Sequence, residues 1–140
     1  MELQTTTIER STTGDTDILD LSGDVEAFVN ETGVREGWVM VFVPGSTGAV
    51  TTIEFESGAV NDLKRAIEQI APRDGEYEHN LRWGDGNGYS HVRAALMGPS
   101  LLLPISEGRV QTGTWQQIVL RDYDNRPRRR RIQLQVLAAG

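Results

Sequence analysis

Cysteine is absent from this sequence of 140 residues, and its absence excludes a group of chemistries. Without cysteine the chain can form no disulfide bond and can offer no thiolate nucleophile. Any metal ion would have to be held by nitrogen and oxygen ligands. The side-chain nitrogens best suited to that role belong to the two histidines, His79 and His91.

A long apolar run is lacking as well. No stretch approaches the roughly 20 residues that a helix needs to cross a bilayer. The opening residues, Met-Glu-Leu-Gln-Thr-Thr-Thr, contain no basic segment followed by an apolar one, so they predict no secretory signal. We therefore expect a cytoplasmic protein without a membrane partner.

Lysine is almost absent, since Lys64 is the only one in the chain. The net charge of −6 and the pI of about 4.9 argue against nucleic acid as a partner, because its binding usually needs a basic surface. Arginines are nevertheless gathered near the C-terminus: Arg126, Arg128, Arg129, Arg130 and Arg131. Heavy arginine use can reflect genome composition, or the cluster can serve a function.

Hydrophobic periodicity predicts an α+β fold, dominated by strands in mixed or antiparallel sheets, with two or three helices in one domain over residues 1–140. The expected strands are 2–10, 17–21, 38–43, 49–55, 100–105, 114–123 and 128–137, and the expected helices are 22–32, 58–70 and 89–97. The apolar run 38–43 predicts a central strand that is covered on both faces. The last two strands are expected to pair as a hairpin through the loop 124–127.

The segment from Tyr77 to Gly98 carries the richest functional signal, because it holds both histidines. Asp85 lies between them and would complete a set of two histidines and one carboxylate, which suits a divalent ion such as zinc or magnesium. Alternatively, His79 and His91 make only loop hydrogen bonds, or bind an anion when they are protonated. The sequence leaves these interpretations open.

Two glycine-containing segments are candidates for binding an anion. Asn87 and Gly88 open the helix expected from residue 89, and the free N–H groups at a helix start favour phosphate. The same pair also suits a plain turn. Between two expected strands, the hydroxyls of Ser46 and Thr47 and the nearby backbone amides form a second candidate cradle, for which a simple strand bend is the alternative.

Four further residues complete the hypothetical site. Arg128 and Arg130 continue the apolar face of the last strand, so we expect them at the mouth of the interior side, where their planar guanidinium groups match phosphate oxygens. A solvated or intersubunit charge cluster is the alternative. Gln116 can bind substrate or serve a strand edge, and Glu54 can act as a general base or remain an exposed carboxylate. Trp115 is expected to anchor the core.

Several motifs make this sequence resemble the YjbQ family, also called the secondary thiamine-phosphate synthase family. The motifs are Val41–Thr51, Tyr77–His79, Asp85–His91, Gly98–Ser100, Gly113–Gln117, and Asp122–Asp124 followed by Pro127–Arg130. The resemblance covers nearly the whole chain. Much of the family reads His-Thr-Thr-Ala where this chain has Gly45-Ser46-Thr47-Gly48, so one of three site histidines is replaced by Gly45.

The resemblance implies a compact α+β fold, a homotrimer with sites near subunit boundaries, and an unsettled physiological role. It also implies a weak secondary activity, which makes thiamine phosphate from a pyrimidine diphosphate and a thiazole phosphate. In that hypothesis His91, Asp85 and Glu54 are catalytic, and His79 and His91 hold the divalent metal. The alternative, favoured by the missing histidine, is a non-catalytic trimeric binder of a metabolite or anion.

Overall fold

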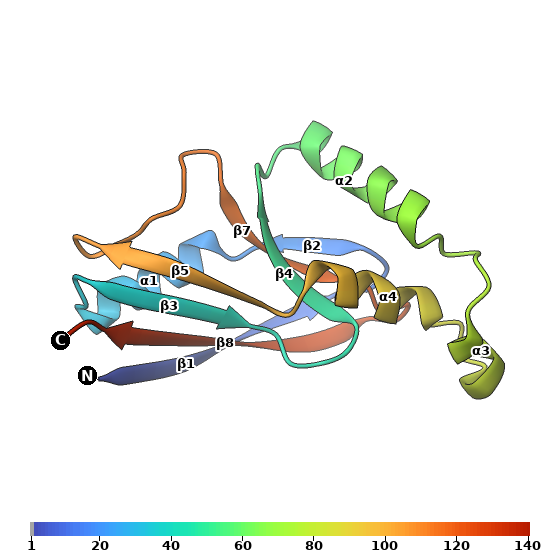
Figure 1. The fold of residues 1–140 in the computed structure, drawn as a ribbon, viewed down its shortest axis with the longest axis horizontal. Coiled ribbons are helices and arrows are strands. Elements are labelled where there is room, and N and C mark those ends of the chain that lie inside the picture. The colour runs from blue at the N-terminus through green and yellow to red at the C-terminus, as the bar shows by residue number, and fades with distance from the viewer. Residues whose placement is uncertain (1) are drawn as a thin grey trace.

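Two antiparallel sheets organise residues 2–140, the part of the chain that the computed structural model describes. The larger sheet has the order β1 (Leu3–Thr12), β8 (Arg128–Ala138), β3 (Gly37–Phe42), β5 (Ser100–Ser106) and β6 (Arg109–Val110). The smaller sheet has the order β2 (Asp17–Asp20), β7 (Gln117–Asp122) and β4 (Gly48–Ile53). Figure 1 shows β1, β8, β3 and β5 side by side, with both chain ends at one end of the molecule.

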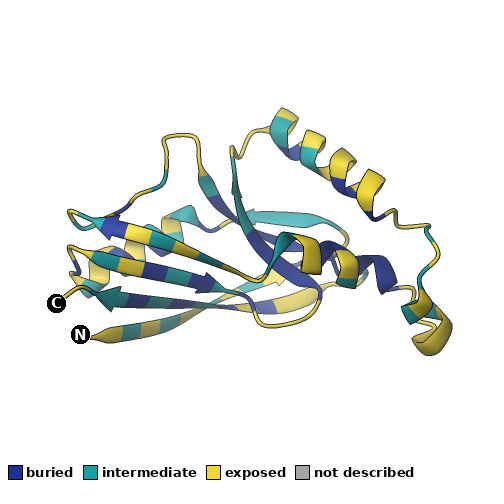
Figure 2. Ribbon diagram, in the orientation of Figure 1, coloured by how far each residue is buried: buried dark blue, intermediate teal, exposed yellow. Residues whose placement is uncertain are grey.

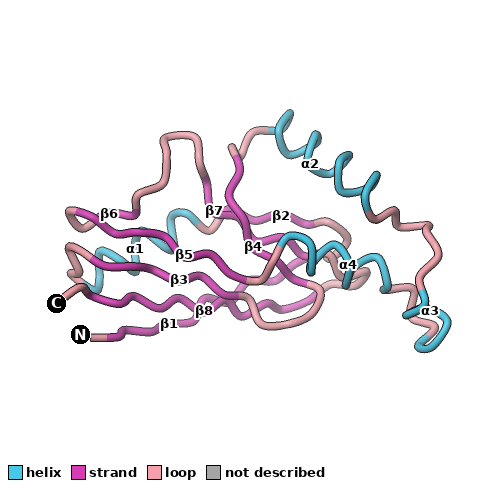
Figure 3. The backbone as a smooth tube through the Cα atoms, viewed as in Figure 1, coloured by secondary structure: helices cyan, strands magenta, loops and turns pink. Residues whose placement is uncertain are grey.

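Four helices accompany the sheets within the described residues: α1 (Ser22–Thr32), α2 (Ser57–Ile70), α3 (Glu78–Trp83) and α4 (Gly88–Met97). In Figure 3, α1 lies along the larger sheet, whereas α2, α3 and α4 gather toward the opposite end of the molecule from the chain termini. The predicted strand-dominated α+β class is confirmed. None of the helices in residues 2–140 is long and apolar enough to span a bilayer.

The main core lies between the two sheets and α1. Val39 and Leu134 from the larger sheet meet Val50 and Leu120 from the smaller one, and Val25 of α1 joins them. Each such side chain stabilises the fold by about 1.5–3 kcal/mol when it is removed from water. A second, smaller cluster joins α2 and α4 to the smaller sheet through Ala49, Ile67, Ala94 and Tyr123. Figure 2 shows that the buried residues follow this interior.

The alternation predicted for the last strand is confirmed. Ile132, Leu134 and Val136 are fully buried in β8. The predicted end of α1 is confirmed too, since Gly33 adopts the left-handed conformation with φ +70°. Ser22, the first residue of the helix expected over 22–32, suits an N-cap by its residue type, but it does not cap α1, because its hydroxyl accepts a hydrogen bond from the Ile118 amide of β7.

The predicted hairpin between the last two strands is also wrong, since β7 and β8 belong to different sheets. The backbone turns away after Asp122, where the Tyr123 amide bonds to the Thr47 carbonyl. The carboxylates of Asp122 and Asp124 then accept hydrogen bonds from the amides of Asp124 and Arg126. These side chains fix an irregular loop that carries the chain from one sheet to the other.

The strand at 38–43 was expected to be covered on both faces, but β3 and its neighbour β5 are each covered on one face only. Trp38 of β3 is 52% exposed and Leu102 of β5 is 63% exposed, although their neighbours Val39 and Leu103 face the core. The continuous apolar runs concealed this alternation. Two other expectations fail: α3 lies within the stretch expected to be loop, and Trp115 is 71% exposed in a turn rather than part of the core.

Candidate functional site

The two histidines lie together at the junction of α3 and α4. The ring centroids of His79 and His91 are 4.4 Å apart, with an angle of 44° between the ring planes. The Oδ1 atom of Asp85 lies 3.4 Å from Nδ1 of His79. The alignment is too poor for a hydrogen bond, but the pair is ionic whenever His79 is protonated.

Glycines make the junction of α3 and α4 possible. Gly84 ends α3 in the left-handed conformation, with φ +66°. Gly88 opens α4 so close to Tyr77 that a Cβ atom at position 88 would overlap the Cβ of Tyr77. The Gly88 amide donates to the Asn80 side chain at 2.8 Å. This donor, which the sequence suggested for an anion, therefore has a partner within the chain.

Asn87 links the histidine junction to the loop after β7. Its buried side chain accepts hydrogen bonds from the Ser90 hydroxyl (2.5 Å) and the Asn125 amide (3.1 Å). It also donates to Asp124 at 3.4 Å. Asn87 therefore has a structural role, because it holds the start of α4 against the segment 124–125.

Asp124 is a buried carboxylate at the centre of this network. It accepts hydrogen bonds from the Thr47 hydroxyl, the Arg128 guanidinium and the Arg126 amide, each at 3.0 Å. Burial by itself would raise the pKa of Asp124, but the hydrogen bonds from Thr47, Arg128 and Arg126 outweigh burial and hold that pKa below its usual range. The carboxylate therefore remains charged in the folded protein at neutral pH.

Arg130 forms a second buried ion pair beside the first. Its Nε and Nη2 atoms reach the two oxygens of Asp122 at 3.0 and 2.7 Å, and Nη2 also donates to the Thr47 hydroxyl at 2.7 Å. Thr12 donates a short hydrogen bond to the same carboxylate. Arg128 and Arg130 thus point to the same side of β8, as their alternation predicted. Their guanidinium groups donate several of their hydrogen bonds to Asp124, Asp122 and Thr47 of the same chain.

The loop expected to cradle an anion instead surrounds the Arg130 side chain. A Cβ atom at Gly45 would lie 2.9 Å from Nη1 of Arg130, and one at Gly48 would lie 3.4 Å from its Nε. Gly45 also has φ +117°, which side chains rarely tolerate. Arg130 therefore comes close to the space that a side chain at position 45 would enter. Ser46 lies exposed between these glycines.

Glu54 and Gln116 lie elsewhere, at the far end of β4 from Thr47. Gln116 donates to the Thr52 hydroxyl at 3.0 Å and accepts from the Gly113 amide at 3.0 Å, so it stabilises the turn before β7. Glu54 is exposed just beyond the end of β4. One chain therefore does not bring these residues to the histidine pair.

The donor set does not fit a metal ion within a single chain. No group of three or more His, Asp or Glu side chains in residues 2–140 is arranged to hold one. Within the chain, Nδ1 of His79 lies 3.4 Å from Oδ1 of Asp85. The described residues of one chain therefore do not form a zinc or magnesium site by themselves.

A hollow of about 280 Å³ lies beside the histidine junction. It is lined by Asp85, Asn87, Asn125 and Arg126. The Arg126 guanidinium is exposed and makes no ion pair with any other residue from 2 to 140. Together with the two imidazoles, this side chain gives the region groups that can attract an anion.

The sequence alone missed the carboxylates that organise this site. Asp122 and Asp124 alternate at the end of β7, just as Arg128 and Arg130 alternate in β8. Two aspartates two residues apart, followed by two arginines two residues apart, could have suggested two parallel ion pairs. Arg121 was missed as well: it is fully buried, and its three nitrogens have no hydrogen-bond partner in residues 2–140.

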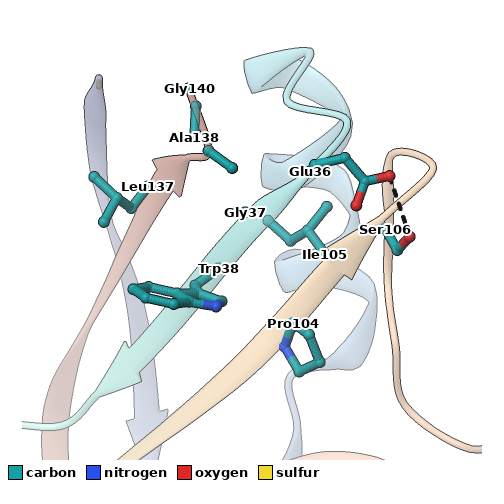
Figure 4. A pocket seen from close by; sticks show the side chains of 10 residues that line it. Glu36, Gly37, Trp38, Pro104, Ile105, Ser106, Leu137, Ala138 and Gly140 are labelled. Atoms are coloured by element: carbon teal, nitrogen blue, oxygen red, sulfur yellow. Dashed lines mark hydrogen bonds between the residues drawn. The ribbon is translucent and has the colours of Figure 1, made fainter.

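A second concave surface lies on the open face of the larger sheet, about 530 Å³ in volume. Figure 4 shows Trp38, Pro104 and Leu137 on its floor, from three adjacent strands. Glu36 contributes a carboxylate at one edge, where it accepts a hydrogen bond from Ser106. The surface is mostly apolar, and it carries no group suited to acid–base chemistry apart from Glu36.

Comparisons with known proteins place this arrangement in a family. Residues 6–139 match the model of the family described as "UPF0047 protein YjbQ-like". A UPF0047 protein from Methanothermobacter thermautotrophicus is 35% identical over 136 residues, which cover 97% of this chain and 93% of that protein. A UPF0047 protein from Mycobacterium bovis is 38% identical over 117 residues, which cover 84% and 88% of the two chains.

Solved structures agree with these matches. A YbjQ-like protein of unknown function from Sulfolobus solfataricus superposes with a TM-score of 0.93 at 29% identity, and the match covers 99% of each chain. A YjbQ/UPF0047 protein from Clostridium acetobutylicum gives a TM-score of 0.86 at 28% identity, over 94% of this chain and 99% of that one. The resemblance noted from the motifs is confirmed, and the chain belongs to the UPF0047 (YjbQ-like) family.

Proposed function

We propose that this protein binds a small phosphorylated metabolite in the hollow beside His79 and His91. The carrying observation is the 4.4 Å separation of the two imidazoles, beside a hollow that is lined by Asp85 and Arg126 among others. Asp85 lies against Nδ1 of His79, which leaves His91 and Arg126 to donate hydrogen bonds to the anion. This binding needs no metal ion, in keeping with the donor set.

A titration with phosphate monoesters, followed by calorimetry, tests this proposal. We expect His91→Asn to weaken binding by about tenfold, the loss expected for one charge-assisted hydrogen bond. His91 is half-buried, so its replacement by a similar-sized amide should preserve the fold. Binding of equal strength in the variant would rule out this location, and failure of every phosphate compound to bind the natural chain would rule out the function.

A transferase is the second candidate, and the contact between His79 and Asp85 favours it. A carboxylate beside an imidazole is an arrangement that can move a proton. In the reaction that the family resemblance suggests, the nitrogen of a thiazole phosphate would attack the carbon of a pyrimidine diphosphate, and diphosphate would leave. Product formation by the natural chain but not by His79→Ala would support this activity. Equal product from both would remove His79 from the mechanism.

We also propose that the protein is a homotrimer that uses the open face of the larger sheet. Support comes from three rows of facing residues across β1, β8, β3 and β5 that carry no charge: Leu3, Leu137, Trp38 and Pro104; Thr5, Gln135, Met40 and Leu102; Thr7, Gln133, Phe42 and Ser100. Uncharged, partly apolar faces of this kind suit subunit contacts. Such an assembly offers a route by which Glu54 and Gln116 of one subunit reach the histidines of another.

A further inference from the structure

The Arg130 guanidinium is held rigidly, but one of its nitrogens donates no hydrogen bond within the described residues. Its side chain is 8% exposed, and Nε and Nη2 are fixed by Asp122 and Thr47. Its Nη1 atom makes no hydrogen bond with any residue from 2 to 140. A guanidinium always carries its protons in proteins, so Nη1 presents donors in a fixed position.

Nη1 lies beside the exposed glycine at position 45, which leaves the space in front of it open. The nitrogen lies 2.9 Å from the site that a Cβ atom would occupy there, so any other residue would crowd it. Among residues 2–140, the side-chain polar atoms that are shielded from solvent and lack a hydrogen-bond partner belong to His79 and Arg121. Nη1 of Arg130 also lacks a partner, but it is not shielded from solvent in this way. This nitrogen therefore keeps contact with solvent at the exposed Gly45–Ser46 turn.

We infer that Nη1 of Arg130, uncovered by Gly45, is a binding site for a phosphate oxygen. The inference rests on the proposed function and deepens it, because it adds a donor that is already held in place before the ligand arrives. A donor fixed by Asp122 and Thr47 loses little conformational freedom on binding. A charged guanidinium donor forms a stronger hydrogen bond to phosphate than a neutral one.

The charges around this nitrogen define the kind of ligand. Asp122 neutralises Arg130 and Asp124 neutralises Arg128, so the region has little net charge to attract a free ion. Recognition then depends on the direction of the hydrogen bond and on contacts to the rest of the molecule. The network from Thr47 through Asp124 to Asn87 connects this donor to the histidine junction, so a phosphate ester suits the site better than free phosphate.

Substitution at Gly45 tests the inference. Gly45→Ala places a methyl group over Nη1, and we expect the affinity for glycerol phosphate to fall by about tenfold. Gly33→Ala is the matched control, because Gly33 also has a positive φ (+70°) but nothing within 4 Å of the added methyl. We expect this control to bind like the natural chain. Unchanged affinity in Gly45→Ala, with the fold intact, would overturn the inference.

Two measurements cover the case in which Gly45→Ala does not fold. Arg130→Lys keeps a cation near Asp122 but removes Nη1, and we expect the same loss of affinity. A crystal of the natural chain with glycerol phosphate should place a phosphate oxygen within hydrogen-bond distance of Nη1. Phosphate bound only at His79 and His91 would overturn the inference yet leave the proposed function standing, whereas no binding by the natural chain would remove the proposed function itself. Parallel titration with inorganic phosphate distinguishes recognition of the ester from recognition of the free ion.

Discussion

At the scale of single residues, Arg121 is an uncompensated charge in the interior. It is fully buried, with its guanidinium 5.0 Å from the ring centre of Tyr123 and no hydrogen bond to residues 2–140. Burial lowers the pKa of Arg121, because removal from water disfavours the charged form. The cation–π contact offsets only part of that cost.

Replacement of Arg121 by methionine should therefore not destabilise the protein. We expect the free energy of unfolding in urea to be unchanged or to rise by up to about 4 kcal/mol, as when buried charges give way to apolar side chains. The control is Arg93→Met, which removes bonds to Glu68 and to the Ala71 carbonyl and should cost about 1–3 kcal/mol. A clear loss of stability in Arg121→Met would indicate that the charge has a partner.

Asp124 gives a prediction about pH. Its pKa is lower in the folded chain than in the unfolded one, so its charge stabilises the fold above the unfolded pKa. That contribution is lost as the pH falls through the folded pKa. We expect Asp124→Asn to reduce stability near neutral pH and to flatten the decline in unfolding free energy as the pH falls below about 5. An equally steep decline in the variant would contradict this account.

The parity of Arg128 and Arg130 was predictable from the sequence, because a strand alternates its faces. The partners of these residues were not. Asp122 and Asp124 meet them only because the chain passes from the smaller sheet to the larger one between positions 123 and 127. Partners that lie on another sheet depend on how the strands are connected, and the alternation of residues along one strand does not specify that connection.

At the scale of elements, the close approach of α3 and α4 depends on Gly88. A Cβ atom there would overlap the Tyr77 Cβ, and neither backbone can move without disturbing the histidine junction. We expect Gly88→Ala to lower the free energy of unfolding by about 1–3 kcal/mol, the usual cost of overpacking. The control is Gly23→Ala in α1, where nothing lies within 4 Å; alanine there should stabilise the helix by about 1 kcal/mol. Equal effects of the two substitutions, measured by urea unfolding, would contradict this role.

The helices and most strands follow from periodicity and from helix-ending glycines and prolines. In α2, for example, Leu63, Ile67 and Ile70 recur at helical spacing; Leu63 and Ile67 pack into the smaller core cluster, whereas Ile70 near the helix end is 65% exposed. The hairpin failed for another reason. Adjacent strands in sequence usually pair, but side-chain caps at Asp122 and Asp124 redirect this connection. The short helix α3 was missed because six residues give too little periodic signal.

At the scale of the whole molecule, the open face of the larger sheet is the most distinctive surface. Trp38 lies there at 52% exposure, opposite Pro104 and Leu137 on the neighbouring strands. We expect Trp38→Glu to convert the proposed trimer to monomers in sedimentation velocity, because a buried unpaired charge opposes association. Leu81→Glu on α3, which is 88% exposed, should leave the assembly unchanged. A natural chain that sediments as a monomer would refute the proposed assembly.

The position of Glu54 shows what the sequence could not reveal at this scale. The sequence allowed Glu54 and Thr47 to belong to one site. In the structure the six residues of β4 lie between them in an extended strand, so the two residues stand at opposite ends of it. Whether these ends meet is a property of the assembly and not of the isolated chain. The same holds for Gln116, which lies at the Glu54 end.

The most direct test of the proposed phosphate site uses nitrogen-detected NMR of the imidazoles. The chain has only two histidines, so every imidazole signal reports on the proposed site. Titration with glycerol phosphate should shift the signals of both His79 and His91 along one saturable curve, and the shifts of the remaining ring should weaken in His91→Asn. Imidazole signals that stay unchanged through the titration would contradict phosphate binding at this junction.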